Sequence, residues 1–250
     1  MRFSSMVKMT MVAVIVLAVL GLVAQLSSVI ATNQLSQAQT EAAQRQTAIN
    51  ALETANTTLT DNARVYVVSG LSESLGNYFN ELYVVRNRDY GEKLIKEHGG
   101  TAEQNELVAQ MKANAKGTTE MEIHAMALAA LSRGEDFATL PADLENFAFT
   151  LEERAMSPEA AGLAARDIVF GQTYMNATKS VSSPINALTL AESDTARADN
   201  QIARATAVQR IAIFSLIGLS ALLAVEVIVF LVIVLRTVNK PLSGHTKALR

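Results

Sequence analysis

Two long apolar runs organise the hydrophobic pattern of this chain. The first covers residues 9–31 and contains only uncharged polar interruptions, and the second covers residues 211–235 and contains one charge, at Glu226. An α-helix rises about 1.5 Å per residue, so each run is long enough to cross the roughly 30 Å hydrocarbon layer of a bilayer. The pattern therefore predicts two membrane-spanning helices.

A cleaved signal peptide is the alternative interpretation of the first run. Val29 and Ala31 are small residues with the spacing of a cleavage site. The helical pattern continues directly beyond residue 31, which favours an uncleaved span.

Beyond the first run, apolar residues recur at alternating intervals of three and four. This spacing places them on one face of a helix that extends to about Ser69, where Gly70 is a suitable C-cap. Arg45 and Asn56 occupy two of these inward positions, which indicates a packed helix with polar interruptions. The apolar members of the stripe are Leu35, Ala38, Ala42, Ile49, Leu52, Leu59, Ala63 and Tyr66.

Helical spacing also predicts the elements that follow. One helix is expected over residues 75–96, a second from near Thr101 to about residue 132, and a shorter one between Pro141 and Pro158. A last helix runs from Glu159 into the second apolar run. We therefore expect an all-α fold: a membrane-anchored antiparallel bundle of four long helices with short extra helices.

Two positions weaken the last helix. Gly171, directly after Phe170, is a possible break, and Pro184 predicts a kink because proline removes a backbone donor and clashes with the preceding turn.

Composition agrees with a helical protein. Half of the residues are hydrophobic, only 5% are aromatic, and the sequence contains neither Trp nor Cys. Disulfides are therefore excluded, and the middle segment is long enough to bury a core without them.

Charge near the apolar runs predicts the topology. Basic residues flank both runs on the terminal sides, which places both ends in the cytoplasm by the positive-inside rule. The expected regions are a cytoplasmic tail at 1–8, spans at 9–31 and 211–235, an extracytoplasmic domain at 32–210, and a second cytoplasmic segment at 236–250. The flanking basic residues are Arg2, Lys8, Arg236, Lys240, Lys247 and Arg250.

No motif indicates catalysis. His98, His124 and His245 are far apart and lack the spacing of metal ligands, and no glycine-rich phosphate loop is present. The middle segment is not basic enough for nucleic-acid binding. The sequence therefore predicts no catalytic residue, no metal site, no cofactor and no nucleic-acid partner.

Residues 63–90 are the candidate ligand-binding region, because aromatic rings and guanidinium groups gather there. Such groups bind small organic anions or aromatics by bidentate pairing and stacking. The alternative is that the rings fill the core and the arginines pair with surface acids. The candidates are Arg64, Tyr66, Tyr78, Tyr83, Arg86 and Arg88.

Glu226 is a second unusual residue. An acid near the middle of a bilayer costs about 2.5–3.5 kcal/mol on insertion scales, so it is expected to face another helix. Counting inward from the two ends places it near the depth of Ala18 and Gly21, small residues that permit close helix packing. We expect Glu226 to tune helix packing in a dimer, or else to be an acid tolerated in a very apolar helix.

Several short segments have the character of one known family. They are LTDNARVYVVSG at 59–70, YFNEL at 78–82, RNRD at 86–89, EIHAM at 122–126, VFGQTYMNATK at 169–179, and Val238, Pro241 and Leu242 after the second run. Together they resemble the N-terminal sensor half of bacterial methyl-accepting chemotaxis proteins. The resemblance implies a four-helix-bundle-type ligand-binding region and the start of a HAMP linker at 236–250.

This resemblance also implies partners and a location. Such a receptor is a two-pass homodimer in the bacterial inner (cytoplasmic) membrane, which detects a small molecule or a ligand-carrying binding protein. It would reach a chemotaxis kinase complex through cytoplasmic parts beyond Arg250, and it would not itself be an enzyme. Two other classes stay open: the sensor region of a histidine kinase or diguanylate cyclase, and a structural or tethering membrane protein.

Overall fold

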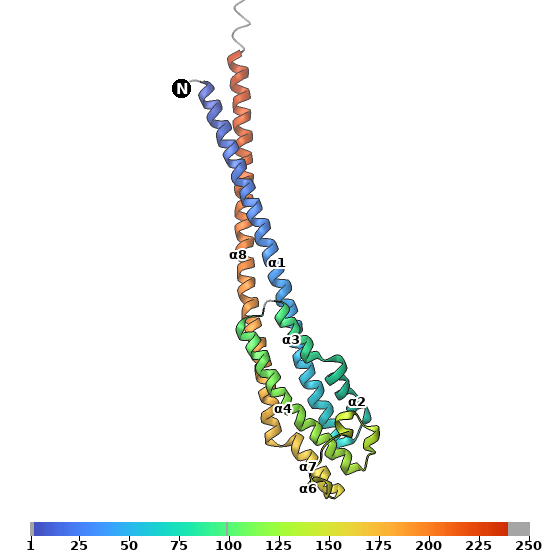
Figure 1. Ribbon diagram of the computed structural model, residues 1–250. Helices are drawn as coiled ribbons and strands as arrows, with labels where there is room; N and C mark the ends of the chain where they lie inside the picture. Colours follow the sequence, from blue (N-terminus) through green and yellow to red (C-terminus); the bar gives the residue numbers. More distant parts are fainter. Residues whose placement is uncertain (1–2, 99, 240–250) are drawn as a thin grey trace, which may run out of the picture. The chain divides into compact units, whose positions relative to one another are not determined.

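The computed structural model describes residues 3–98 and 100–239. About 90% of the protein is helical, and no strand occurs within the described ranges (Figure 1). The chain divides into two compact units, one of Met1–Ala38 with Ala198–Arg250 and the other of Gln39–Arg197. The expected HAMP start falls largely on residues 240–250, outside the described residues.

The described part of the first unit consists of two helical segments. They are α1 (Phe3–Ser69) up to Ala38 and α8 (Gln172–Asn239) from Ala198 onward. Segments within Val19–Ser69 and Gln201–Val232 are long and apolar enough, by length and composition, to cross a membrane. The second overlaps the expected span at 211–235, and large apolar side chains along it, such as Phe214 and Leu222, are exposed.

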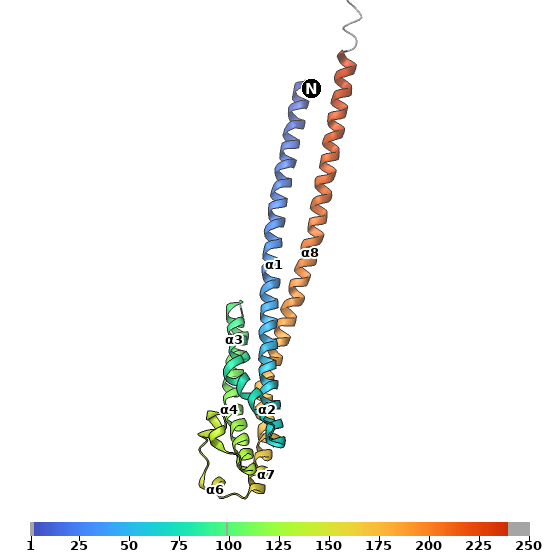
Figure 2. The same cartoon turned by 90° about the vertical axis from the view of Figure 1, so that its right-hand side faces the viewer.

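The second unit contains the remaining parts of α1 and α8, within residues 39–197, and eight shorter elements among the residues that the structure describes. These are α2 (Ser72–Asn80), the π-helix η1 (Glu81–Val85), α3 (Asn87–Glu97), α4 (Ala102–Arg133), the 3₁₀-helix η2 (Phe137–Thr139), α5 (Ala142–Glu145), α6 (Leu151–Arg154) and α7 (Pro158–Phe170). The most extensive packing among the short elements joins α4 to α7, which lie side by side in both views (Figures 1 and 2).

The ends of the long helices follow local capping chemistry. Gly70 ends α1 with φ 73°, and Gly134 ends α4 with φ 64°, a left-handed conformation that glycine adopts without strain. At the start of α4, the Thr101 hydroxyl accepts from the backbone N–H of Gln104, whose side chain accepts from the Thr101 N–H.

The predicted helix at 75–96 is wrong as a single element. It is interrupted at η1 and at Arg86, whose φ of 55° turns the chain before α3 begins. Glu81 stabilises this corner, because its carboxylate accepts from both the backbone N–H and the side-chain amide of Asn87, each at 2.9 Å. A buried acid thus caps the first turn of α3.

The predictions that involved prolines and glycines have several outcomes. The segment between Pro141 and Pro158 forms two single-turn helices, because Thr150 and Glu153 make a capping box that starts α6 independently of α5. Pro184 lies inside α8, which remains helical on both sides of it. Gly171 separates α7 from α8 in an extended conformation (ψ 160°), which confirms the expected break.

Two apolar clusters form the core of the second unit. One gathers residues of α1, α2, α4, α7 and α8 around Tyr66, Tyr78 and Tyr174, and the other gathers residues of α1, α3, α4 and α8 around Leu52 and Leu188. The predicted apolar stripe of α1 is confirmed between residues 49 and 66, where Ile49, Leu52, Leu59, Ala63 and Tyr66 are all buried.

A buried ion pair lies beside the second cluster, and we call it the Arg45 pair. Arg45 donates to Glu192 through Nε at 2.9 Å and Nη2 at 3.2 Å, and its Nη1 donates to the carbonyl of His98 at 2.8 Å. Gln104 also donates to the Glu192 carboxylate at 3.1 Å. The polar interruption at Arg45 therefore connects α1 to α8, α4 and the end of α3.

Candidate functional site

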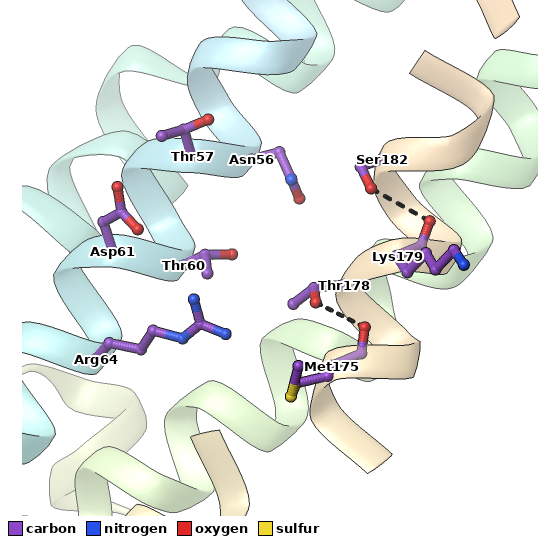
Figure 3. Close-up of a pocket in the computed structure, with 9 residues that line it drawn as sticks. All are labelled: Asn56, Thr57, Thr60, Asp61, Arg64, Met175, Thr178, Lys179 and Ser182. Atoms are coloured by element: carbon purple, nitrogen blue, oxygen red, sulfur yellow. Dashed lines mark hydrogen bonds between the residues drawn. The ribbon is translucent and has the colours of Figure 1, made fainter. Parts of the chain in front are cut away.

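A groove between α1 and α8 in the second unit is the main candidate site. It has a volume of about 350 Å³, and most of the residues that line it have polar side chains. The lining residues are Asn56, Thr57, Thr60, Asp61 and Arg64 from α1, and Met175, Thr178, Lys179 and Ser182 from α8 (Figure 3).

Arg64 is the cation that faces the groove. Its Nε donates to the carbonyl of Val169 at 3.2 Å, and its guanidinium carbon lies 5.6 Å from the ring centroid of Phe170 and 5.2 Å from that of Tyr174. The terminal nitrogens make no hydrogen bond to any described residue and extend toward α8 (Figure 3). Lys179 points away from Arg64 in the same view. Arg64 is therefore held in place with its donor ends available to a ligand.

Acceptors complement this cation. The side-chain oxygen of Asn56 is buried without a hydrogen-bond partner among the described residues, and Asp61 provides a carboxylate at the wall. A buried acceptor without a partner costs about 1–3 kcal/mol, which a ligand donor would recover. The groove therefore suits a small polar molecule that carries an anionic group for Arg64 and a donor for Asn56.

A buried acid, Glu122 of α4, lies behind the groove. Its side chain is fully buried and accepts from the hydroxyls of Tyr174 at 2.6 Å, Tyr78 at 3.0 Å and Thr60 at 3.3 Å. Thr60 also lines the groove, and the Tyr174 ring supports Arg64. The same side chains thus contact both the groove and the buried acid.

Burial is the main influence on the charges of this cluster. It raises the pKa of Glu122 above the ordinary carboxyl value, although the hydroxyl donors and the nearby charge of Arg88 oppose the shift. Burial and the adjacent carboxylate raise the pKa of both Tyr78 and Tyr174, so these hydroxyls stay protonated donors.

Arg88, in the first turn of α3, lies close to this acid. Its Nη1 donates to Thr119 of α4 at 3.2 Å, and Thr119 is one helical turn from Glu122. Its Nε and Nη2 are buried and have no hydrogen-bond partner in the described part of the chain. Burial lowers the pKa of Arg88, and the negative charge of Glu122 is the largest opposing influence.

The remaining sequence candidates do not line the groove. Tyr66 is buried and donates to Glu135 at 2.7 Å, and burial, assisted by this bond, raises its pKa to about 12. Tyr83 is exposed and donates to Asp143 at 2.6 Å. Arg86 is exposed and pairs with Asp89 at 2.6 Å. The candidates therefore divide between the groove, the core and the surface.

Sequence reasoning missed Glu122 and Asn56 as site residues. A signal for Glu122 exists in the spacing of α4, because it lies four residues after Thr118 and three before Ala125, both of which are buried. An acid on that inward face indicates a polar site inside the core.

The predicted packing of Glu226 with Ala18 and Gly21 concerns the first unit. A Cβ atom added to Gly21 would lie 3.7 Å from Ile217, which is nine residues from Glu226 along α8. Nine residues of helix correspond to about 13 Å, and the packing of Glu226 against Ala18 and Gly21 stays a prediction. Glu226 is exposed in the single chain, and the side chain of Ala18 lies outside what the structure describes.

The chemistry of the groove is that of a binding site, with a fixed cation, a carboxylate and several hydroxyls. The described residues contain no group of three or more side chains suited to hold a metal ion. No family profile matches the sequence, and no curated protein or solved structure matches it. Functional inference therefore starts from the site and the two apolar helices.

Proposed function

We propose that this chain is the sensor region of a transmembrane chemoreceptor of the methyl-accepting type. Residues 32–210 would form an extracytoplasmic antiparallel four-helix bundle with short extra helices, and residues 1–8 and 236–250 would lie in the cytoplasm, the latter as the start of a HAMP linker. The receptor would function as a homodimer in a bacterial inner membrane.

One observation supports this proposal most directly. α8 supplies one wall of the groove through Met175, Thr178, Lys179 and Ser182, and it stays helical to Asn239 through the apolar segment at 201–232. A groove built on a helix that continues into a candidate span is the arrangement a transmembrane signal requires.

The proposed mechanism is a shift between two packings of α1 and α8. A ligand that bridges Arg64 on α1 and the hydroxyls on α8 binds one packing more tightly than the other, and its occupancy therefore changes their populations. A small sliding or rotation of α8 would then pass to the cytoplasmic side.

A chimera tests the sensing step. Residues 1–250 are fused to the cytoplasmic part of a methyl-accepting receptor, and kinase output is measured with acetate, succinate, aspartate or benzoate as separate probes. We expect at least one probe to change the output, and Arg64→Gln to abolish that response because it removes the anion contact. Arg86→Gln is the matched control, because Arg86 is exposed and its one ion pair among the described residues is with Asp89. If no probe changes the output, or if both variants respond alike, the proposal is wrong.

Topology is tested separately by cysteine labelling, since the chain contains no native cysteine. Lys116→Cys lies on an exposed part of α4, and Ser243→Cys lies in the expected cytoplasmic segment. A membrane-impermeant maleimide applied to intact cells should label position 116 and spare position 243. The reverse labelling pattern would exclude an extracytoplasmic sensor domain.

A further inference from the structure

The two carboxyl oxygens of Glu122 accept different numbers of hydrogen bonds. Within the described residues, its Oε1 meets two hydroxyls, those of Tyr174 and Thr60, whereas its Oε2 meets only that of Tyr78. An ionised carboxylate offers about four lone-pair positions, so Oε2 has room for another donor. The present arrangement also suits a neutral acid, because the Tyr78 hydroxyl can accept a hydrogen bond from a protonated Oε2.

Arg88 of α3 is the nearby donor, because it is bonded to Thr119, one helical turn before Glu122 on α4. Nε and Nη2 form the edge of a guanidinium group that binds carboxylates with two parallel hydrogen bonds, and these are the two atoms of Arg88 that have no partner among the described residues. Arg88 is tethered to Thr119, on the turn of α4 that precedes Glu122. An unpaired buried donor edge thus lies beside a buried acid with an open acceptor position.

We propose that Glu122 and Arg88 form a proton-controlled switch in the core of the second unit. With Glu122 neutral, the carboxyl group stays with the hydroxyls of Thr60, Tyr78 and Tyr174. When the proton leaves to water, the carboxylate turns to the free edge of Arg88 and draws α3 toward this face of α4.

The balance of forces supports two such states. A buried carboxylate without a cation is strongly disfavoured, and a buried guanidinium without an anion is disfavoured in the same way, so ionisation of Glu122 relieves Arg88. The hydroxyl contacts favour the first state, and a charge-assisted bidentate pair favours the second. The proton decides between them.

The groups that face this carboxyl group or its partners come from several elements. Tyr78 of α2 and Tyr174 of α8 face the carboxyl group directly, Arg88 of α3 supplies the cation, and Glu81 of η1 adds a negative charge near Arg88. Arg64 of α1 acts through Tyr174, whose ring it covers. On α4 itself, the partly buried His124 pairs with Glu153 at 2.6 Å.

The switch would also change the groove. When the carboxylate leaves Tyr174 and Thr60, the hydroxyl of Thr60 becomes free to face the groove and the ring beneath Arg64 loses its anchor. The groove would therefore respond to pH. The inference concerns the core alone and does not depend on the receptor proposal.

Infrared spectroscopy of the full-length protein in lipid nanodiscs tests the protonation step. A pH titration should reveal the carbonyl stretch of a protonated carboxyl group, which disappears with a midpoint above the ordinary range for glutamate. Glu122→Gln should abolish this band. Glu120→Gln should retain it, because Glu120 is exposed on the same helix and meets only Lys116, at 4.0 Å. His124→Asn should retain the band at the same midpoint, because His124 pairs with Glu153 and not with Glu122.

Spin labels test the movement. The cysteine-free chain permits labels at Lys93 of α3 and Ser183 of α8, both exposed positions. The distance distribution between them should shift with the same midpoint as the carbonyl band, and the shift should be lost in Glu122→Gln. Arg88→Lys keeps the charge but lacks the two-donor edge, so it should move the midpoint and reduce the shift.

Three results would overturn the switch: a carbonyl band unaffected by Glu122→Gln, a band that titrates without a distance shift, or a distance shift that survives in both variants. Each result is independent of whether any ligand changes the output of the chimera.

Discussion

Two buried acid–arginine sites in the second unit differ in how completely they are paired. Every side-chain nitrogen of Arg45 donates to an acceptor, and Glu192 accepts from both Arg45 and Gln104. Arg88 bonds to the described residues through only one of its nitrogens, and Glu122 is surrounded by hydroxyls. Burial is similar for the two acids, at 3% exposure for Glu192 and 0% for Glu122.

The comparison shows that burial alone does not determine what an ion pair does. A pair with all partners satisfied has one favourable arrangement and stabilises a single packing of α1, α4 and α8. A pair with open donor and acceptor positions has a second arrangement close by. The Arg45 pair is therefore structural, whereas Glu122 and Arg88 are suited to change state.

The largest effect is expected from breaking the complete pair. Arg45→Met leaves the Glu192 carboxylate buried without its cation, which typically lowers the free energy of unfolding by about 3–5 kcal/mol. Thermal and chemical unfolding of the full-length protein in detergent measures this loss. The double variant Arg45→Met with Glu192→Met should recover most of it, and a double variant as unstable as the single one would contradict the interpretation.

A second test asks whether the helices around the Arg45 pair are tightly packed. A Cβ atom at Gly91 of α3 would lie 2.7 Å from Cγ of Leu52 and 2.8 Å from the carbonyl oxygen of Ala48, both on α1. Gly91→Ala should therefore cost about 1–3 kcal/mol of stability through overpacking. Gly76→Ala is the control: a Cβ there meets no atom within 4 Å, so higher helix propensity should stabilise the protein by up to about 1 kcal/mol.

A third prediction concerns pH. Because burial raises the pKa of Glu122, the folded state binds a proton more tightly than the unfolded state does. The stabilisation from this proton is complete below the unfolded pKa and is lost as pH rises through the folded pKa, by about 1.4 kcal/mol per unit of difference. Unfolding measured across this range should show a decline that Glu122→Gln removes. Identical slopes in the wild-type protein and the variant would contradict it.

The smallest effect is expected at an exposed bridge. Glu92 accepts from Lys112 at 2.7 Å and from Lys96 at 2.6 Å, and these bonds lower its pKa. Glu92→Gln should cost less than about 1 kcal/mol above the ordinary carboxyl pKa, and the difference should vanish as pH falls through the lowered value. Glu97→Gln removes only a 3.8 Å contact to Lys93 and should change stability even less.

Local chemistry explains which parts of the fold are predictable from sequence. Gly70, Gly134 and Thr101 mark helix ends because a cap depends on residues within one turn. The break at Arg86 was missed because the apolar pattern of 75–96 continues across it, and the corner is stabilised by the buried Glu81. Helical periodicity alone does not reveal such a capping contact.

The candidate site was predictable only in part. The sequence identifies a region rich in rings and guanidinium groups, and Arg64 does face the groove. The roles of the other candidates depend on how each helix is rotated, which the sequence does not reveal. Arg88 lies on the α3 side of Glu122 and Arg64 on the α1 side, so these two arginines contact different sites. Tyr66 and Tyr78 fill the core, as the alternative interpretation proposed.

The π-helical corner has a consequence for how this protein tolerates change. Arg88 follows Arg86 by two residues. The direction in which α3 leaves the corner therefore determines which part of α4 the Arg88 guanidinium group contacts. A substitution at Glu81 or Asn87, which do not line the groove, would therefore change the position of Arg88 relative to Glu122 and so the pKa of that acid. Natural variation at this bend would then change the pH at which Glu122 ionises without replacing any residue that lines the groove.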